Sequence, residues 1–237
     1  MKSNRAQLYT ANHSRFTQRS RQSPAAARLF KILLLNYKDA NVKYITFVFI
    51  IFASTLCFTC TSNKFLKLCN YSDMTYSIPV GFNPVEVKQN PDLLYQYAIK
   101  HKNKKLEIRY SIFPLKDEIE AYNAGLKDKT KNKIVLIDPN LDHELVAISA
   151  AMNISRSPIT QENNTFKPDA VKQDFNADWV TSYYIENNSE YGGGYQYSLV
   201  VAIHKKNIAN AFIVFLFDDD KDIRNEMFSS FYNLKFK

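Results

Sequence analysis

The feature that most constrains this sequence is an apolar stretch over residues 45–60 that contains no charged side chain. As a helix it would span about 24 Å, short of the roughly 20 residues of a comfortable membrane-spanning helix and just longer than the apolar region of most signal peptides. Lys43 precedes the stretch, and small polar residues follow it at 61–63. The sequence therefore predicts a cleaved secretion signal or an uncleaved membrane anchor, in preference to a buried core helix.

Charge is divided unevenly along the chain. Residues 1–41 hold eight Lys or Arg residues and one acidic residue, whereas residues 60–237 hold 22 basic and 22 acidic residues. The formal charge of +8 therefore belongs to the segment that ends at Lys43. Nucleic-acid-binding domains carry a basic patch, so the neutral remainder predicts no nucleic-acid partner. The four lysines within residues 100–105 are expected in a charged hairpin turn.

The apolar stretch and the charge distribution predict that the chain is divided into four segments. Residues 1–41 form a basic leader, which would not be translated if Val42 is the true start. Residues 42–59 form a signal peptide or anchor helix, and residues 60–75 a polar tether. Residues 76–237 form one globular domain, for which a hydrophobic content of 46% is sufficient. The positive-inside rule places this domain outside the cytoplasm in either case.

The end of the apolar stretch resembles a bacterial lipoprotein signal, in which a peptidase cuts before a Cys that then carries a lipid. Cys60 is the better candidate, because Thr59 is small and a polar run follows. Cys57 and Phe58 make the match to the lipobox imperfect. The resemblance implies a lipid anchor at Cys60 and an extracytoplasmic, periplasmic or outer-membrane location. The alternative is a type II membrane protein with an uncleaved anchor.

Alternating apolar side chains predict an antiparallel sheet. The alternation runs through a hairpin over residues 92–115 and two later strands, over 177–187 and 195–205. The next strand, 208–219, is continuously apolar, as expected for a strand covered on both faces. With helices packed on a sheet of about five to six strands, the predicted fold class is α+β.

Two helices are expected to pack on this sheet. One covers residues 142–155, and its buried stripe is expected to consist of Leu141, Leu145, Ile148 and Met152. The other closes the chain with a stripe of Ile223, Met227, Phe231 and Leu234. The aspartates at 218–222 would cap it, because the helix dipole favours acids there. Residues 156–176 are polar and interrupted by Pro, which predicts a long loop.

This order of elements resembles that of the PsbP-like α/β/α sandwich domains, over roughly residues 76–237. The resemblance rests on the element order, on the meander from FNADW through LVVAIHK to FIVFLF, and on the closing amphipathic helix. It implies a binding or assembly role more than catalysis. It assigns no functional residue.

Catalytic, cofactor and metal motifs are not recognisable, so no cofactor is expected. His143 and Glu144 begin like a zinc-binding helix, but Ala147 occupies the position of the second His. The aspartates from 218 to 222 lack the turn Gly and the bidentate Glu of a calcium loop.

One candidate binding surface consists of aromatic residues near the first meander strand: Trp179, Tyr183 and Tyr184. The alternative is that Trp179, the only tryptophan, anchors the core.

Two function classes remain open. The first is a lipid-anchored extracytoplasmic protein that binds or assembles with a protein partner in the cell envelope. The second is a membrane-anchored, hydrolase-like enzyme whose site is built from residues distant in sequence. A deep pocket with converging His, Asp or Glu side chains would favour the enzyme, and an exposed aromatic groove would favour binding.

Overall fold

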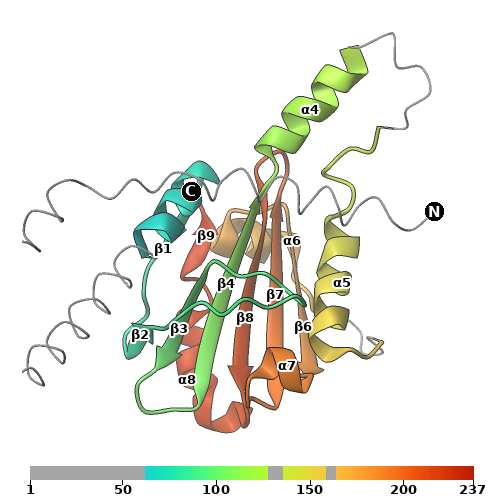
Figure 1. Cartoon of the computed structure of the whole chain (residues 1–237). Coiled ribbons are helices and arrows are strands. Elements are labelled where there is room, and N and C mark those ends of the chain that lie inside the picture. Colours follow the sequence, from blue (N-terminus) through green and yellow to red (C-terminus); the bar gives the residue numbers. More distant parts are fainter. Residues whose placement is uncertain (1–61, 128–135, 159–163) are drawn as a thin grey trace, which may run out of the picture. The chain divides into compact units, whose positions relative to one another are not determined.

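The computed structural model describes residues 62–127, 136–158 and 164–237. These residues form an α+β fold, as the sequence predicts, around an antiparallel sheet with the order β2-β3-β4-β8-β7-β6-β5 (Figure 1). Its strands are β2 (Phe82–Pro84), β3 (Tyr97–His101), β4 (Leu106–Pro114), β5 (Asn164–Thr165), β6 (Trp179–Glu186), β7 (Tyr197–Lys205) and β8 (Ala209–Phe217). The seven strands exceed the five to six predicted, because β2 and β5 are too short to show alternation.

The predicted hairpin and the predicted meander form one sheet because β4 pairs with β8. The pairing runs from Leu106 opposite Phe217 to Pro114 opposite Ala209. On its other side β8 pairs with β7, so it lies at the centre of the sheet. Every residue of β8 is buried. The prediction that this continuously apolar strand is covered on both faces is therefore confirmed.

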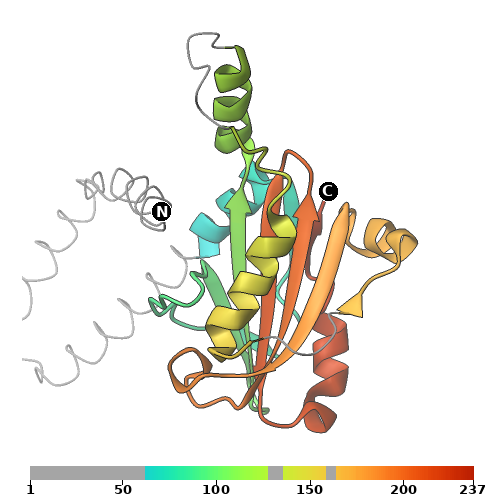
Figure 2. The same cartoon turned by 90° about the vertical axis from the view of Figure 1, so that its right-hand side faces the viewer.

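The sheet separates two hydrophobic clusters, because successive side chains of a strand point to opposite faces. On β8, Ile213 and Phe215 belong to the first cluster, and Val214 and Leu216 to the second. The first is covered by helix 62–71, α8 (Asp220–Ser230) and the strand pair β1 (Met74–Tyr76) and β9 (Leu234–Phe236). The second is covered by α5 (His143–Ser155). Figure 2 shows α5 and α8 on opposite sides of the sheet.

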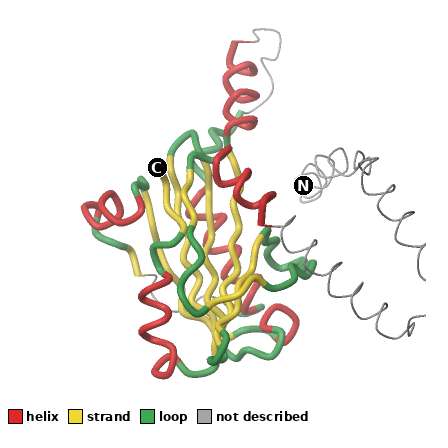
Figure 3. The backbone as a smooth tube through the Cα atoms, turned by 90° about the vertical axis from the view of Figure 1, so that its left-hand side faces the viewer, coloured by secondary structure: helices red, strands yellow, loops and turns green. Residues whose placement is uncertain are grey.

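The first described residues differ from the tether predicted over residues 60–75. Residues 62–71 are helical, and β1 pairs with β9 near the end of the chain. Phe65 is buried and stacks on Tyr97 with ring centroids 4.9 Å apart. Cys69 is buried as well, and its burial raises the pKa of its thiol to about 12. The domain therefore includes residue 62, and Figure 3 views it from the side on which this helix lies.

The structure also contains helical elements that the sequence did not predict. Helix α4 (Lys116–Lys127) has no buried residue, and a short helix α7 (Ser189–Gly192) precedes β7. The predicted loop contains α6 (Pro168–Ala170) and a π-helical turn, η1 (Val171–Phe175).

The terminal helix is shorter than its predicted stripe. Helix α8 ends at Ser230, so Leu234 lies in β9 instead. At its start, the Asp219 side chain accepts a hydrogen bond from the Lys221 backbone NH, which confirms the acidic cap. None of the helices in the described part combines the length and apolar character needed to cross a membrane.

Candidate functional site

Helix α5 departs most clearly from its predicted arrangement. The side chains that it buries are small for the most part: Ala147, Ala150, Ala151 and Ile154. Of the predicted stripe, Ile148 contacts the core, whereas Leu141, Leu145 and Met152 are 76%, 61% and 41% exposed. The predicted burial of these three residues was therefore wrong. The buried residues and the predicted stripe both fit helical spacing. The alanines allow the helix axis to approach the sheet closely. We call Leu145 and Met152, together with Leu141 two residues before the helix, the outer face of α5.

The start of α5 is fixed by two stacked histidine rings. His143, its first residue, stacks on His204 of β7 with ring centroids 4.2 Å apart and planes within 9°. Trp179 packs edge-on against His143 at 4.9 Å. His143 Nδ1 donates to the Asn140 carbonyl (2.8 Å), and His204 Nδ1 lies 2.7 Å from the side-chain oxygen of Asn210. Each imidazole is thus already bonded, and together they join α5 to β6 and β7.

The environment of His204 predicts that the domain loses stability in mild acid. Burial, and secondarily the neighbouring His143, lowers the pKa of His204, although Asn210, Asp178 and Asp142 act in the opposite direction. An unfolded histidine has a pKa of about 6.5, so below this pH the unfolded chain binds more protons than the folded one. The stabilising contribution is complete above that pH and is lost as the pH falls. We expect the free energy of unfolding, measured with urea, to decrease between about pH 7 and about pH 5.

The matched variant is His204→Gln, which cannot be protonated in this range. Its unfolding free energy should change less with pH than that of the unaltered protein. If the two pH profiles run parallel, His204 does not contribute to the acid sensitivity.

The end of α5 is fixed by polar contacts. Arg156, in the left-handed conformation at φ 54°, caps the helix and forms ion pairs with Glu190 and with Asp92, the latter at 3.7 Å. Asn188 donates to the Ile154 carbonyl (2.6 Å) and to the Asp92 carboxylate (3.1 Å). The end of α5 is therefore tied both to the segment before β3 and to α7.

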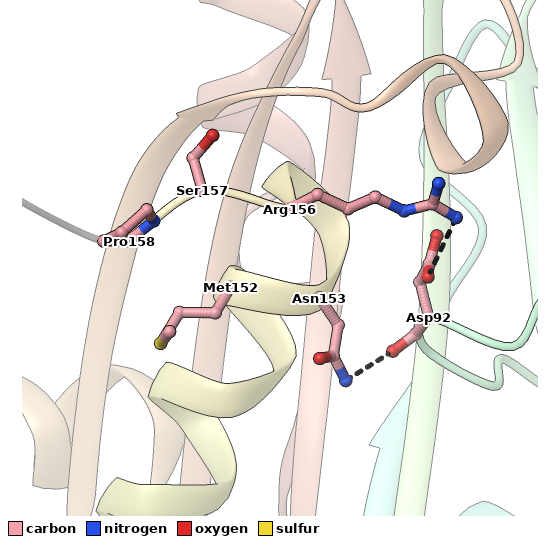
Figure 4. Close-up of a pocket in the computed structure, with 6 residues that line it drawn as sticks. All are labelled: Asp92, Met152, Asn153, Arg156, Ser157 and Pro158. Atoms are coloured by element: carbon pink, nitrogen blue, oxygen red, sulfur yellow. Dashed lines mark hydrogen bonds and ion pairs between the residues drawn. The ribbon is translucent and has the colours of Figure 1, made fainter.

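A pocket of about 350 Å³ lies at this end of α5. Figure 4 shows Arg156 directed toward Asp92, and Asn153 donating to the Asp92 carbonyl at 3.2 Å. The lining residues are Asp92, Met152, Asn153, Arg156, Ser157 and Pro158. Arg156 is already paired with both Asp92 and Glu190, so it offers no unpaired positive charge to a ligand. The pocket continues the outer face of α5 through Met152.

The predicted aromatic surface is not formed as one patch. Trp179 and Tyr183 belong to the cluster under α5, and Tyr183 is buried. Tyr184 points to the opposite face of the sheet, where its ring packs on Tyr197 (5.6 Å) and Phe217 (5.7 Å). Strand alternation separates the two tyrosines, and Trp179 packs against α5.

The other predicted positions add no second site. Cys60, the expected lipidation site, lies outside the described residues. In the part of the chain that the structure covers, no three His, Cys, Asp or Glu side chains are placed to hold a metal ion. Lys104 pairs with Glu226 at 2.9 Å, and Lys105 pairs with Asp218, as suits a charged turn.

The outer face of α5 is thus the candidate functional surface of the described domain. It presents three apolar side chains, and the helix sequence HELVAISAAMNIS contains no Lys or Arg. Neither a protein-family model nor a curated protein matches this chain.

Proposed function

We propose that this protein is a lipid-anchored, extracytoplasmic binding or assembly protein of the cell envelope, and that it docks a protein partner on the outer face of α5. One observation carries the proposal: α5 turns its alanines to the sheet and Leu145 to water, and Leu141, two residues before the helix, is exposed as well. Full burial of a leucine is favourable by about 1.5–3 kcal/mol. Exposed apolar patches on folded domains are typical of interaction sites, and a partner would recover this energy.

Charge favours a protein over a lipid as the occupant of this face. Anionic lipid surfaces attract Lys and Arg, which α5 lacks. Its charged side chain is Glu144, exposed beside Leu145, and Asp142 precedes the helix. Leu145 and Met152 are seven residues apart on one side of α5, a spacing at which a helix enters an apolar groove of a partner, and Leu141 lies just before the helix.

The membrane-anchored part of the proposal is supported by the sequence before the domain. The uncharged stretch 45–60 ends at Cys60, and the following residues carry no net charge. A lipid on Cys60 and an uncleaved helix both place the domain on the extracytoplasmic side. Mass spectrometry of the mature N-terminus distinguishes them. A diacylglyceryl group on Cys60 supports the lipoprotein, and a peptide from residues 1–41 contradicts it.

Photo-cross-linking tests the docking face. A photo-reactive amino acid at position 141, introduced in cells, should form a discrete adduct with another protein. The Leu145→Asp substitution should reduce the adduct at least about fivefold, because a charge in an apolar contact is strongly unfavourable. The same substitution should change the free energy of unfolding by no more than about 0.5 kcal/mol, because Leu145 is exposed.

The matched control is a photo-reactive residue at Phe228 of α8, which is 66% exposed. It should form no adduct that responds to Leu145→Asp. An adduct of twice the mass of the chain would identify a second copy as the occupant instead. An adduct from position 141 that Leu145→Asp leaves unchanged would contradict docking on α5.

A further inference from the structure

A second set of exposed apolar side chains lies on the first elements of the fold. In helix 62–71, Phe65 and Cys69 face the core. The outer side of this helix carries Leu66, which is 40% exposed, and Tyr71, which is 50% exposed and donates its hydroxyl to Asp117 of α4 (2.8 Å). The exposed lysines Lys64 and Lys67 accompany them. An outer side of Leu, Tyr and Lys has the composition of a helix that lies at a membrane surface, and it contrasts with the acidic surroundings of α5.

The loop between β1 and β2 adds two further exposed apolar side chains. Ile78 is 45% exposed and Val80 is 98% exposed, while Pro79 between them is buried. The loop is held in place at its end, because the Gly81 carbonyl accepts a hydrogen bond from the Lys102 NH (2.9 Å). Gly81 adopts φ 88°, and a Cβ there would lie 2.7 Å from the His101 ring. Val80 is therefore presented to solvent by a fixed turn.

Both segments lie against the same strand. Phe65 stacks on Tyr97, the first residue of β3, and Gly81 contacts His101, its last residue. Helix 62–71 belongs to the first hydrophobic cluster and α5 to the second, on the other face of the sheet. A surface built from these segments is thus separate from the outer face of α5.

The chain before this helix leaves little distance from the membrane. One residue, Thr61, separates Cys60 from residue 62, where the described helix is already present. An extended residue spans at most about 3.6 Å. With a lipid on Cys60, or with an uncleaved apolar segment ending there, the start of helix 62–71 must lie next to the headgroup region.

We infer that the domain rests directly on the bilayer, with helix 62–71 and the β1–β2 loop as its membrane-contacting surface. This inference rests on the proposed function, because it requires an anchor that ends near Cys60. Val80 and Ile78 enter the boundary between headgroups and acyl chains, as apolar side chains of surface-bound helices do. Lys64 and Lys67 contact anionic headgroups. The outer face of α5, beyond the opposite face of the sheet, stays open to a partner.

Quenching of tryptophan by lipids tests this placement in the full chain. Trp179 is the only tryptophan, so Trp179→Phe gives a silent background for Val80→Trp. The protein is extracted from membranes and reconstituted into phosphatidylethanolamine and phosphatidylglycerol vesicles with or without brominated acyl chains. The Val80→Trp variant should lose at least about half of its emission to the brominated lipid. Leu141→Trp in the same background, at a similarly exposed position on the α5 side, should lose little.

Three further measurements separate the outcomes. Ile78→Trp should be quenched like Val80→Trp, and Lys64→Glu with Lys67→Glu should weaken the quenching in both. A chain that floats with the vesicles but shows equal quenching at positions 80 and 141 would overturn the membrane-contacting surface and leave the anchor intact. A chain that does not float with the vesicles would overturn the anchor, and with it this inference.

Discussion

Replacing Phe65 by Ala is expected to destabilise the whole domain by about 3–5 kcal/mol, the usual effect of removing a buried phenylalanine. Phe65 is 1% exposed and stacks on Tyr97, and it also contacts Tyr76 edge-on at 5.1 Å. Urea unfolding followed by the fluorescence of Trp179 measures the effect. Because Trp179 packs under α5, its signal reports unfolding on the far side of the sheet.

The control is Leu66→Ala at the neighbouring, partly exposed position. It should destabilise the domain by less than about 1 kcal/mol, since exposed truncations have small effects. If Phe65→Ala leaves the Trp179 transition unchanged, helix 62–71 is not integral to the fold. In that case residues 62–71 would act as the tether that their composition suggests, and the short distance to the membrane would no longer follow.

Replacing Glu107 by Leu is expected to be comparably destabilising, by about 3–5 kcal/mol, because it leaves a buried charge without its partner. Arg109 is 6% exposed, and its Nε donates to Glu107 at 2.8 Å. Its guanidinium lies between the rings of Tyr95 (4.9 Å) and Tyr191 (4.8 Å). These contacts hold the position of the charge, so it cannot move to water when Glu107 is lost.

The double variant Glu107→Leu with Arg109→Met separates the pair from its surroundings. Replacing both charges by apolar groups is often close to neutral, so the double variant should be more stable than Glu107→Leu alone. Urea titration of the three proteins provides the comparison. A double variant that is less stable than Glu107→Leu would show that Arg109 stabilises the domain chiefly through its aromatic neighbours and its bond to the Tyr191 carbonyl (2.7 Å).

The strands of the sheet were the most predictable part of the fold, because the sequence patterns that indicate a strand lie within the strand itself. Leu106, Ile108, Tyr110 and Ile112 alternate along β4, and the structure buries all four. The apolar run of β8 from Ala211 to Phe217 likewise indicates a central strand. The pairing of β4 with β8 joins segments far apart in the sequence, and no local pattern predicts it.

Helix α5 shows that helical periodicity alone does not identify which side of a helix is buried. In α5, Ala147 and Ala151 recur at the same helical spacing as Leu141 and Leu145. Hydrophobicity favours the leucines for the core, but close approach to the sheet favours the alanines. The three alanines at 147, 150 and 151 were the available signal, since a stripe of small residues allows close packing. The residues of the predicted aromatic surface are divided for a related reason, because Tyr183 and Tyr184 are adjacent on a strand and so face apart.

Helix 62–71 could not be predicted because its stabilising contacts are all distant. Half of its ten residues are polar, and Phe65, Leu68 and Cys69 contact the core. The following strand β1 is completed by β9 at the other end of the chain. A short segment of this kind depends on tertiary packing, which overrides its weak local preference.

We expect a protein partner in the cell envelope to cover the outer face of α5. Carbene labelling of intact cells, compared with labelling of the purified protein, measures this coverage residue by residue. Leu141, Leu145 and Met152 should be labelled several-fold less in cells than in the purified protein, while Phe228 of α8 should be labelled equally in both. Equal labelling of the outer face of α5 in cells and in the purified protein would show that no partner covers it.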